Sequence, residues 1–117
     1  MQMTKRIKDG VEILAIKGEL DLGNVAVVKT IIDREISAGK INLVIDMLEL
    51  EYIDSSGIGV IINTMNKIRA LKGRFVLMNL RDSVLRIFSL TKLTAFFTII
   101  KSESELTNVF GGAGKTV

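Results

Sequence analysis

Short runs of apolar residues recur along the chain, separated by segments whose apolar positions are spaced three or four residues apart. Runs that are rich in β-branched residues predict strands. Four such runs span residues 11–17, 41–46, 74–78 and 96–100. Residues 5–8 precede the turn signal Asp9-Gly10, which predicts an antiparallel partner for the first run. The chain therefore opens with a predicted hairpin.

The segments with the wider spacing predict amphipathic helices. The first lies between residues 24 and 38, with apolar positions at Val25, Val28, Ile32 and Ile36. Gly39 suits the position just past its end. A second helix is predicted after Ser56 and ends at Gly73. Its apolar side consists of Ile58, Ile61, Ile62, Met65 and Ile68.

Two shorter helices are predicted in the last third of the chain. Asp82 is placed to cap a helix that runs to about Leu90. Ser102 and Glu105 have the spacing of a capping box, in which each side chain bonds the backbone of the other. This pair predicts a final helix that extends to Phe110.

The predicted order of elements is β-β-α-β-α-β-α-β-α. Strands that alternate with helices predict an α/β fold with a mostly parallel, mixed sheet, here of about five strands with about four helices. The almost wholly apolar run 41–46 is typical of a strand buried on both faces. We expect a single domain over residues 1–110 and a flexible, Gly-rich tail over residues 111–117.

Composition agrees with one folded domain. The chain has 117 residues, of which 48% are hydrophobic and 25% charged, a balance typical of globular proteins. No stretch reaches the roughly 20 consecutive apolar residues of a membrane span, and the first residues lack the apolar stretch of a signal peptide. We therefore expect a cytoplasmic protein without a membrane span.

Several classes of function lose support from the residue types. The chain contains no Cys and no His, which removes thiolate ligands and the commonest general base. The net charge is +3 without a basic run, and aromatic residues make up only 5%, which disfavours binding to nucleic acid. We expect no metal, no cofactor and no nucleic-acid partner.

The segment 52–59 places a carboxylate and two hydroxyls where an apolar run gives way to a predicted helix. Unpaired backbone N–H groups and the positive end of the helix dipole favour a phosphate there. A plain helix cap by Asp54, Ser55 or Ser56 is the simpler interpretation. Gly57 and Gly59 allow either close approach of another molecule or tight packing of helix on strand.

Two motifs, in order, carry a resemblance to a known family. Asp54-Ser55-Ser56-Gly57-Ile58-Gly59 resembles the phosphorylation site of the STAS-domain anti-sigma factor antagonists. Gly18-Glu19-Leu20-Asp21 is similar to the segment that closes the second strand in that family. The resemblance continues to about residue 110. After Asp21, this chain has Leu22-Gly23-Asn24 where relatives often carry more polar residues.

The resemblance implies a regulatory protein that is not an enzyme. Unphosphorylated, it would bind an anti-sigma factor that is also a serine kinase and so free a sigma factor for transcription. The kinase would phosphorylate Ser55, and a serine phosphatase would reverse the modification. The residues that the resemblance assigns to partner binding are Asp21, Asp54, Ser56, Gly57, Ile58 and Gly59. The oligomeric state stays open.

Two alternatives compete with this interpretation. A STAS domain can serve as the interaction module of another signalling or transporter assembly. A small enzyme could instead use Asp21, Asp46 and Asp54 as carboxylates around a metal, but no His supports general-base chemistry. Ser55 is also a poor nucleophile, because the adjacent Asp54, with an ordinary pKa, is a weak base at neutral pH.

Overall fold

The computed structural model describes residues 1–114, and for residues 111–114 it describes the backbone only. The predicted flexible tail over 111–117 lies outside the residues whose side chains are described and stays a prediction. The strands are β1 (Gln2–Lys8), β2 (Val11–Leu20), β3 (Asn42–Asp46), β4 (Leu50–Ile53), β5 (Arg74–Met78) and β6 (Thr98–Ile100). The helices are α1 (Val25–Ser37), α2 (Ser55–Ala70), α3 (Asp82–Leu90) and α4 (Leu106–Gly114), with a 3₁₀ turn, η1 (Glu103–Glu105), before α4.

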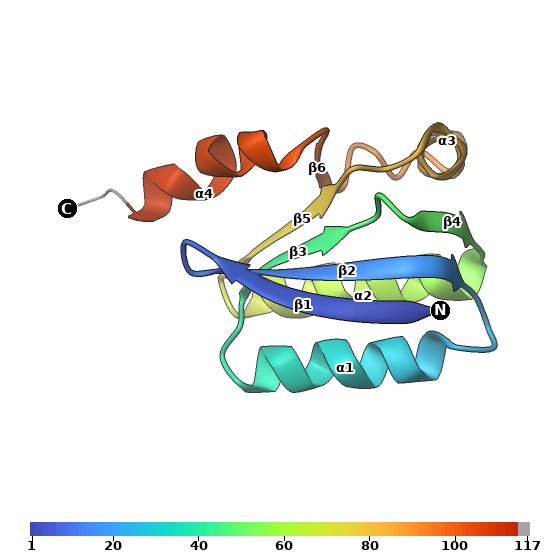
Figure 1. Cartoon of the computed structure of the whole chain (residues 1–117), viewed down its shortest axis with the longest axis horizontal. Coiled ribbons are helices and arrows are strands. Elements are labelled where there is room, and N and C mark those ends of the chain that lie inside the picture. Colours follow the sequence, from blue (N-terminus) through green and yellow to red (C-terminus); the bar gives the residue numbers. More distant parts are fainter. Residues whose placement is uncertain (115–117) are drawn as a thin grey trace.

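These elements form one mixed sheet with the order β1-β2-β3-β5-β6, while β4 pairs separately with β2. Only the β1–β2 pair is antiparallel among the described strands, and the others are parallel (Figure 1). Asp9 and Gly10 both have positive φ, 53° and 79°, as the tight turn of this hairpin requires. The predicted α/β class with a mostly parallel sheet and four helices is confirmed.

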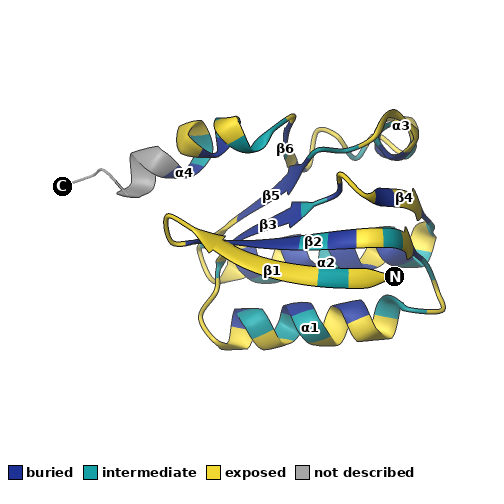
Figure 2. Ribbon diagram, in the orientation of Figure 1, coloured by how far each residue is buried: buried dark blue, intermediate teal, exposed yellow. Residues whose placement is uncertain are grey.

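Helices cover the two faces of the sheet unequally. On one face, Leu14 and Ile16 of β2 join a large cluster with buried residues of α1, α2 and α3. On the other face, Ile13 and its neighbours on β3 and β5 pack beneath Leu106 and Phe110. Figure 2 shows the buried stripe of α1 facing the sheet. Successive side chains of a strand point to opposite faces of the sheet, so Ile13 and Leu14 join different clusters. In a helix, side chains three or four residues apart share one face, which gives α1 its buried stripe.

The segment 47–53 lies between the predicted strand 41–46 and the predicted helix after Ser56, and it contains the strand β4, which the sequence pattern does not predict. Beyond the end of β3, β4 continues alongside β2, with Gly18 opposite Leu50 and Leu20 opposite Ile53. β2 therefore continues to Leu20, past residue 17, where the predicted run ends, and through Gly18, which has a φ of 97°. Its sequence, Leu50-Glu51-Tyr52-Ile53, does not alternate strictly between apolar and polar residues, so the pattern predicts no strand there.

Smaller differences concern the ends of elements. β1 begins at Gln2 rather than at residue 5, and β6 omits Phe96, whose side chain is exposed. The predicted capping box is present, since Glu105 Oε2 accepts a hydrogen bond from the Ser102 N–H at 3.1 Å. Within residues 1–114, no helix has both the length and the apolar content that crossing a membrane requires.

One buried carboxyl group is built into the sheet. Glu12 lies on β2 and is 1% exposed, and neither of its carboxylate oxygens has a hydrogen-bond partner among the described residues. Burial raises the pKa of Glu12 to about 7, and the neighbouring Glu35 carboxylate of α1 adds to the rise. Lys5 donates to Glu35 at 3.3 Å and, with Lys40, opposes the rise. The fold therefore favours a protonated Glu12.

This pKa makes the free energy of unfolding depend on pH. A carboxyl whose pKa is raised on folding contributes stability that is fully present below its ordinary value of 4.5 and is lost as pH rises through about 7. We predict that Glu12→Gln, which cannot ionise, is more stable than the natural chain at pH 8 by roughly 1–3 kcal/mol. Urea unfolding at pH 5 and at pH 8 measures the difference. An equal difference at both pH values would contradict the assignment.

Candidate functional site

The ends of two neighbouring parallel strands form the rim on which the predicted site lies. Leu20 is the last residue of β2 and pairs with Ile53, the last residue of β4. The Asp54 N–H continues this pairing by donating to the Leu20 carbonyl oxygen at 3.1 Å. Asp21 and Asp54 therefore begin the two following segments side by side. Open α/β sheets place their sites at this end of the strands.

Asp54 is the N-cap of α2 and connects three segments. Its Oδ1 accepts the Gly57 N–H at 3.0 Å and the Ser56 hydroxyl at 2.5 Å. Its Oδ2 accepts the Leu22 N–H, in the β2–α1 loop, at 3.0 Å. The Ser56 hydroxyl, followed by the Gly57 N–H, lowers the pKa of Asp54 below its ordinary value. Asp54 is therefore an ionised acceptor at neutral pH.

The two adjacent serines have different environments. Ser55 is exposed at the first position of α2, and its hydroxyl makes no hydrogen bond with the described residues. Ser56 is half-buried and donates its hydroxyl proton to Asp54. The helix thus begins at Ser55, two residues earlier than the predicted start after Ser56, and Asp54 is the residue that caps it. Only Ser55 presents a free hydroxyl at this helix start.

The two glycines of the motif also differ. Gly57 is buried, and a Cβ atom there would lie 2.8 Å from both Ile53 Cγ1 and the Leu20 carbonyl oxygen. Tight packing of α2 on the strand ends therefore accounts for Gly57 without a partner. Gly59 is exposed, and a Cβ there would meet nothing within 4 Å. Ile58, between them, is half-buried against the core.

The β2–α1 loop is held by its own hydrogen bonds. Asp21 Oδ1 accepts the Gly23 N–H at 2.9 Å, and the Asp21 N–H donates to Asn24 Oδ1 at 3.1 Å. The Asn24 side-chain amide also donates to the Glu19 carbonyl oxygen at 2.7 Å. Asn24 is the N-cap of α1 but makes no side-chain cap, because its side chain bonds back to the loop. Asp21 shapes this loop and does not cap the helix.

The carboxylates of the alternative metal site have separate partners. Asp46 Oδ1 accepts from the Leu48 N–H at 3.0 Å and from Asn79 Nδ2 at 3.1 Å. Asp54 accepts only from the motif and from the β2–α1 loop, as described above. Across residues 1–114, no group of three acidic side chains is arranged to hold a metal ion.

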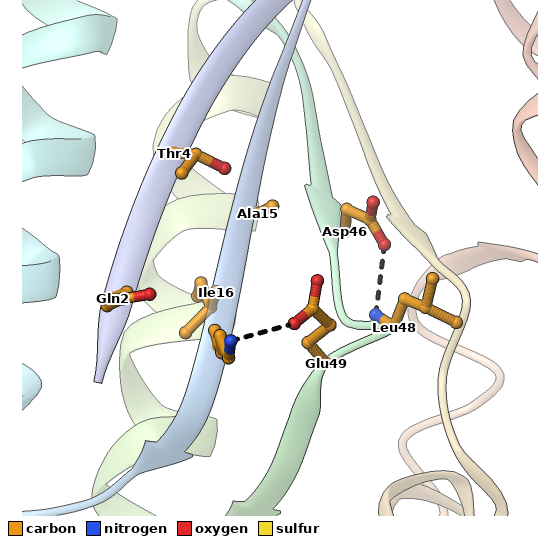
Figure 3. A pocket seen from close by; sticks show the side chains of 8 residues that line it. Gln2, Thr4, Ala15, Ile16, Asp46, Leu48 and Glu49 are labelled. Atoms are coloured by element: carbon orange, nitrogen blue, oxygen red, sulfur yellow. Dashed lines mark hydrogen bonds and ion pairs between the residues drawn. The ribbon is translucent and has the colours of Figure 1, made fainter.

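A shallow cavity of about 200 Å³ lies between β1, β2 and the turn after β3 (Figure 3). Its charged side chains are already paired, since Lys17 Nζ lies 3.6 Å from Glu49 Oε2 and Asp46 bonds the Leu48 backbone. None of the residues that the motif assigned to phosphorylation or partner binding lines it. The cavity is therefore separate from the site around Ser55.

The sequence indicated the start of α2 but not that the β2–α1 loop is hydrogen-bonded to it. The Leu22 N–H links the loop to Asp54, and Asn24 fixes the loop through two hydrogen bonds. The only local signal was Asp21 two residues before Gly23, a spacing typical of an Asx turn. The site presents the Ser55 hydroxyl to solvent, and among the described residues no general base is placed to activate it.

Comparisons with known proteins identify the family and the fold of the chain. The sequence matches the family model of the STAS domain over residues 2–106. It is 29% identical to the anti-sigma-B factor antagonist of Listeria monocytogenes, over 91% of this chain and 92% of the relative. The crystal structure of TM1081 from Thermotoga maritima is similar with a TM-score of 0.86 at 30% identity, over 91% of this chain and 92% of that one. The phosphorylated form of Bacillus SpoIIAA shares the fold, with a TM-score of 0.71 at 22% identity, over 92% and 99% of the chains.

The contrast between the glycines predicts opposite effects of one added methyl group. Gly57→Ala forces backbone and side chains apart, so we expect it to lower the free energy of unfolding by roughly 1–3 kcal/mol. Gly59→Ala meets open space in a helix and should raise it by up to about 1 kcal/mol. Urea unfolding of both variants tests the pair. A Gly57→Ala variant as stable as the natural chain would show that the helix start is packed more loosely.

Proposed function

The chain belongs to the STAS-domain family of anti-sigma factor antagonists, and from this premise we propose that it switches an anti-sigma factor through Ser55. In the proposed cycle, the unphosphorylated chain binds an anti-sigma factor that is also a serine kinase, in the cytoplasm, and a sigma factor is released. The kinase transfers the γ-phosphoryl group of ATP to Ser55 Oγ and releases ADP and a proton. A serine phosphatase hydrolyses the phosphate ester and restores the binding form.

The observation that carries the proposal is the free hydroxyl of Ser55. A kinase acceptor must be exposed and able to approach the γ-phosphate in line with the leaving oxygen. Ser55 is exposed and makes no hydrogen bond with the described residues, whereas the Ser56 hydroxyl donates to Asp54. A rigid helix start and a sheet rim hold the acceptor in place, so little ordering is needed on binding.

The same position explains how a phosphate would act as a switch. At the start of α2 the phosphate gains backbone N–H groups and the favourable end of the helix dipole. It also adds about −1.5 to −2 charges next to the ionised Asp54 and near Asp21. We expect the fold to persist while the surface, which already carries Asp21 and Asp54, becomes more strongly negative. A partner surface that fits the first state would be repelled by the second.

The chain itself acts as substrate and binding partner in this cycle. Asp54, the carboxylate next to Ser55, has a lowered pKa and already accepts three hydrogen bonds. Such a group is a weak base, so transfer chemistry is supplied by the kinase and hydrolysis by the phosphatase. The phosphorylated form of SpoIIAA is a solved example of a modified protein with this fold.

We predict that Ser55 is the single efficient acceptor. The experiment incubates the chain with each purified anti-sigma serine kinase of the source organism and ATP, followed by fragmentation mass spectrometry. The expected product carries one phosphate on Ser55. Phosphate on Ser56, with Ser55 unmodified, would contradict the assignment, since Ser56 would have to leave Asp54 first.

A second prediction concerns affinity. Ser55→Ala should bind the kinase as tightly as the natural chain and stay bound in the presence of ATP, while Ser55→Asp should bind at least tenfold more weakly because of the added charge. Ser37→Asp is the matched control, since it adds the same charge at the exposed far end of α1. Calorimetry measures all three. Equal weakening by Ser55→Asp and Ser37→Asp would refute a local electrostatic switch.

A further inference from the structure

The β2–α1 loop presents a leucine to solvent, and the backbone N–H of this leucine bonds Asp54, the residue before the acceptor serine. Leu22 is 77% exposed, the largest exposed fraction among the large hydrophobic side chains of the described residues. Its neighbours on either side, Asp21 and Gly23, are polar or lack a side chain. Leu22 contributes nothing to either core cluster. The stability of the fold therefore gives no account of an apolar residue at this position.

The loop that carries Leu22 is fixed by hydrogen bonds on both sides of it. Asp21 accepts the Gly23 N–H, and its carbonyl oxygen accepts the Asn24 N–H at 3.1 Å and the Val25 N–H at 2.9 Å. Asn24 closes the loop back onto the Asp21 N–H and the Glu19 carbonyl. Because the backbone is held in this way, the Leu22 side chain projects from a fixed point at the rim of the sheet.

Leu22 is also joined directly to the phosphorylation motif. Its own N–H donates to Asp54 Oδ2 at 3.0 Å, while Asp54 Oδ1 caps the helix that begins with Ser55. One carboxylate thus sets the place of an apolar side chain and of the acceptor hydroxyl. A partner that approaches Ser55 must meet Leu22 in a fixed geometry.

We propose that Leu22 is an apolar anchor that enters a hydrophobic pocket of the kinase beside its phosphoryl-donor site, and that it determines which kinase the chain binds. The inference rests on the proposed function of Ser55 and adds the chemistry that selects the partner. Interfaces obtain most of their affinity from a few central side chains that become fully desolvated. A preordered leucine loses little freedom on binding, so its burial contributes directly to affinity.

The rigidity of the loop can be tested without a partner. The backbone N–H order parameter of Leu22, measured by ¹⁵N relaxation in the free chain, should be near the value of about 0.85 that rigid backbone shows. Asp54→Ala should lower it, because the variant removes the acceptor of this N–H. An order parameter below about 0.6 in the natural chain would overturn the proposal, since a mobile leucine cannot act as a preordered anchor.

The binding test uses Leu22→Ser, Leu22→Met and a matched control, Leu71→Ser. Leu71 is 51% exposed and lies just past the far end of α2, about 24 Å from Ser55 along the helix. Each variant is titrated by calorimetry against each purified anti-sigma serine kinase of the source organism. We expect Leu22→Ser to weaken binding at least tenfold, Leu22→Met to keep affinity within about threefold, and Leu71→Ser to leave it unchanged, with equal melting temperatures for the two Leu22 variants and the natural chain.

The possible failures are distinguishable. If the natural chain binds a kinase and Leu22→Ser binds it equally well, Leu22 is no anchor, while the switch at Ser55 stands. If Leu71→Ser weakens binding as much as Leu22→Ser, the effect is not local and the proposal is overturned. If the natural chain binds none of the kinases, the proposed function fails together with the inference that rests on it.

Discussion

The carboxylate of Asp54 is the interaction on which the site depends. Its two oxygens accept three hydrogen bonds, from the start of α2 and from the β2–α1 loop. These bonds cap the helix, hold Ser56 and fix Leu22, and they leave the Ser55 hydroxyl free. Because the acceptor is ionised, each bond is charge-assisted and stronger than one between neutral groups. A single side chain thereby separates the two adjacent serines into a support and a presented hydroxyl.

The sheet brings Asp54 to this place. β2 is long enough to pair first with β3 and then with β4, so that Leu20 and Ile53 end at one level. Both side chains are fully buried, and Gly57 allows α2 to approach them at van der Waals distance. Hydrophobic burial of Leu20 and Ile53 therefore stabilises the rim. The groups that the rim presents to solvent, around Asp54 and Ser55, are polar. In the proposed switch, this division would let a phosphate change the surface while the buried side chains beneath it stay in place.

Much of this arrangement could be predicted from the sequence, for identifiable reasons. The strands 41–46 and 74–78 and the helix from Val25 have clear periods, so the α/β class followed from pattern alone. β4 could not be predicted, since its pairing depends on how far β2 continues past Gly18. The difference between Ser55 and Ser56 was equally hidden, because it depends on which residue caps α2. The Leu22 N–H bonds the side chain of Asp54, which lies 32 residues further along the chain, and no local motif encodes such a contact.

The most direct measurement is an acid titration of the backbone amides by NMR in the free, unmodified chain. If one ionised carboxylate holds both segments, the Leu22 and Gly57 N–H signals must shift together, with a single midpoint below the ordinary aspartate pKa of about 3.9. Both signals should lose their hydrogen-bonded shifts as Asp54 is protonated. Separate midpoints for the two amides, or a shared midpoint at the ordinary value, would contradict the central role of Asp54.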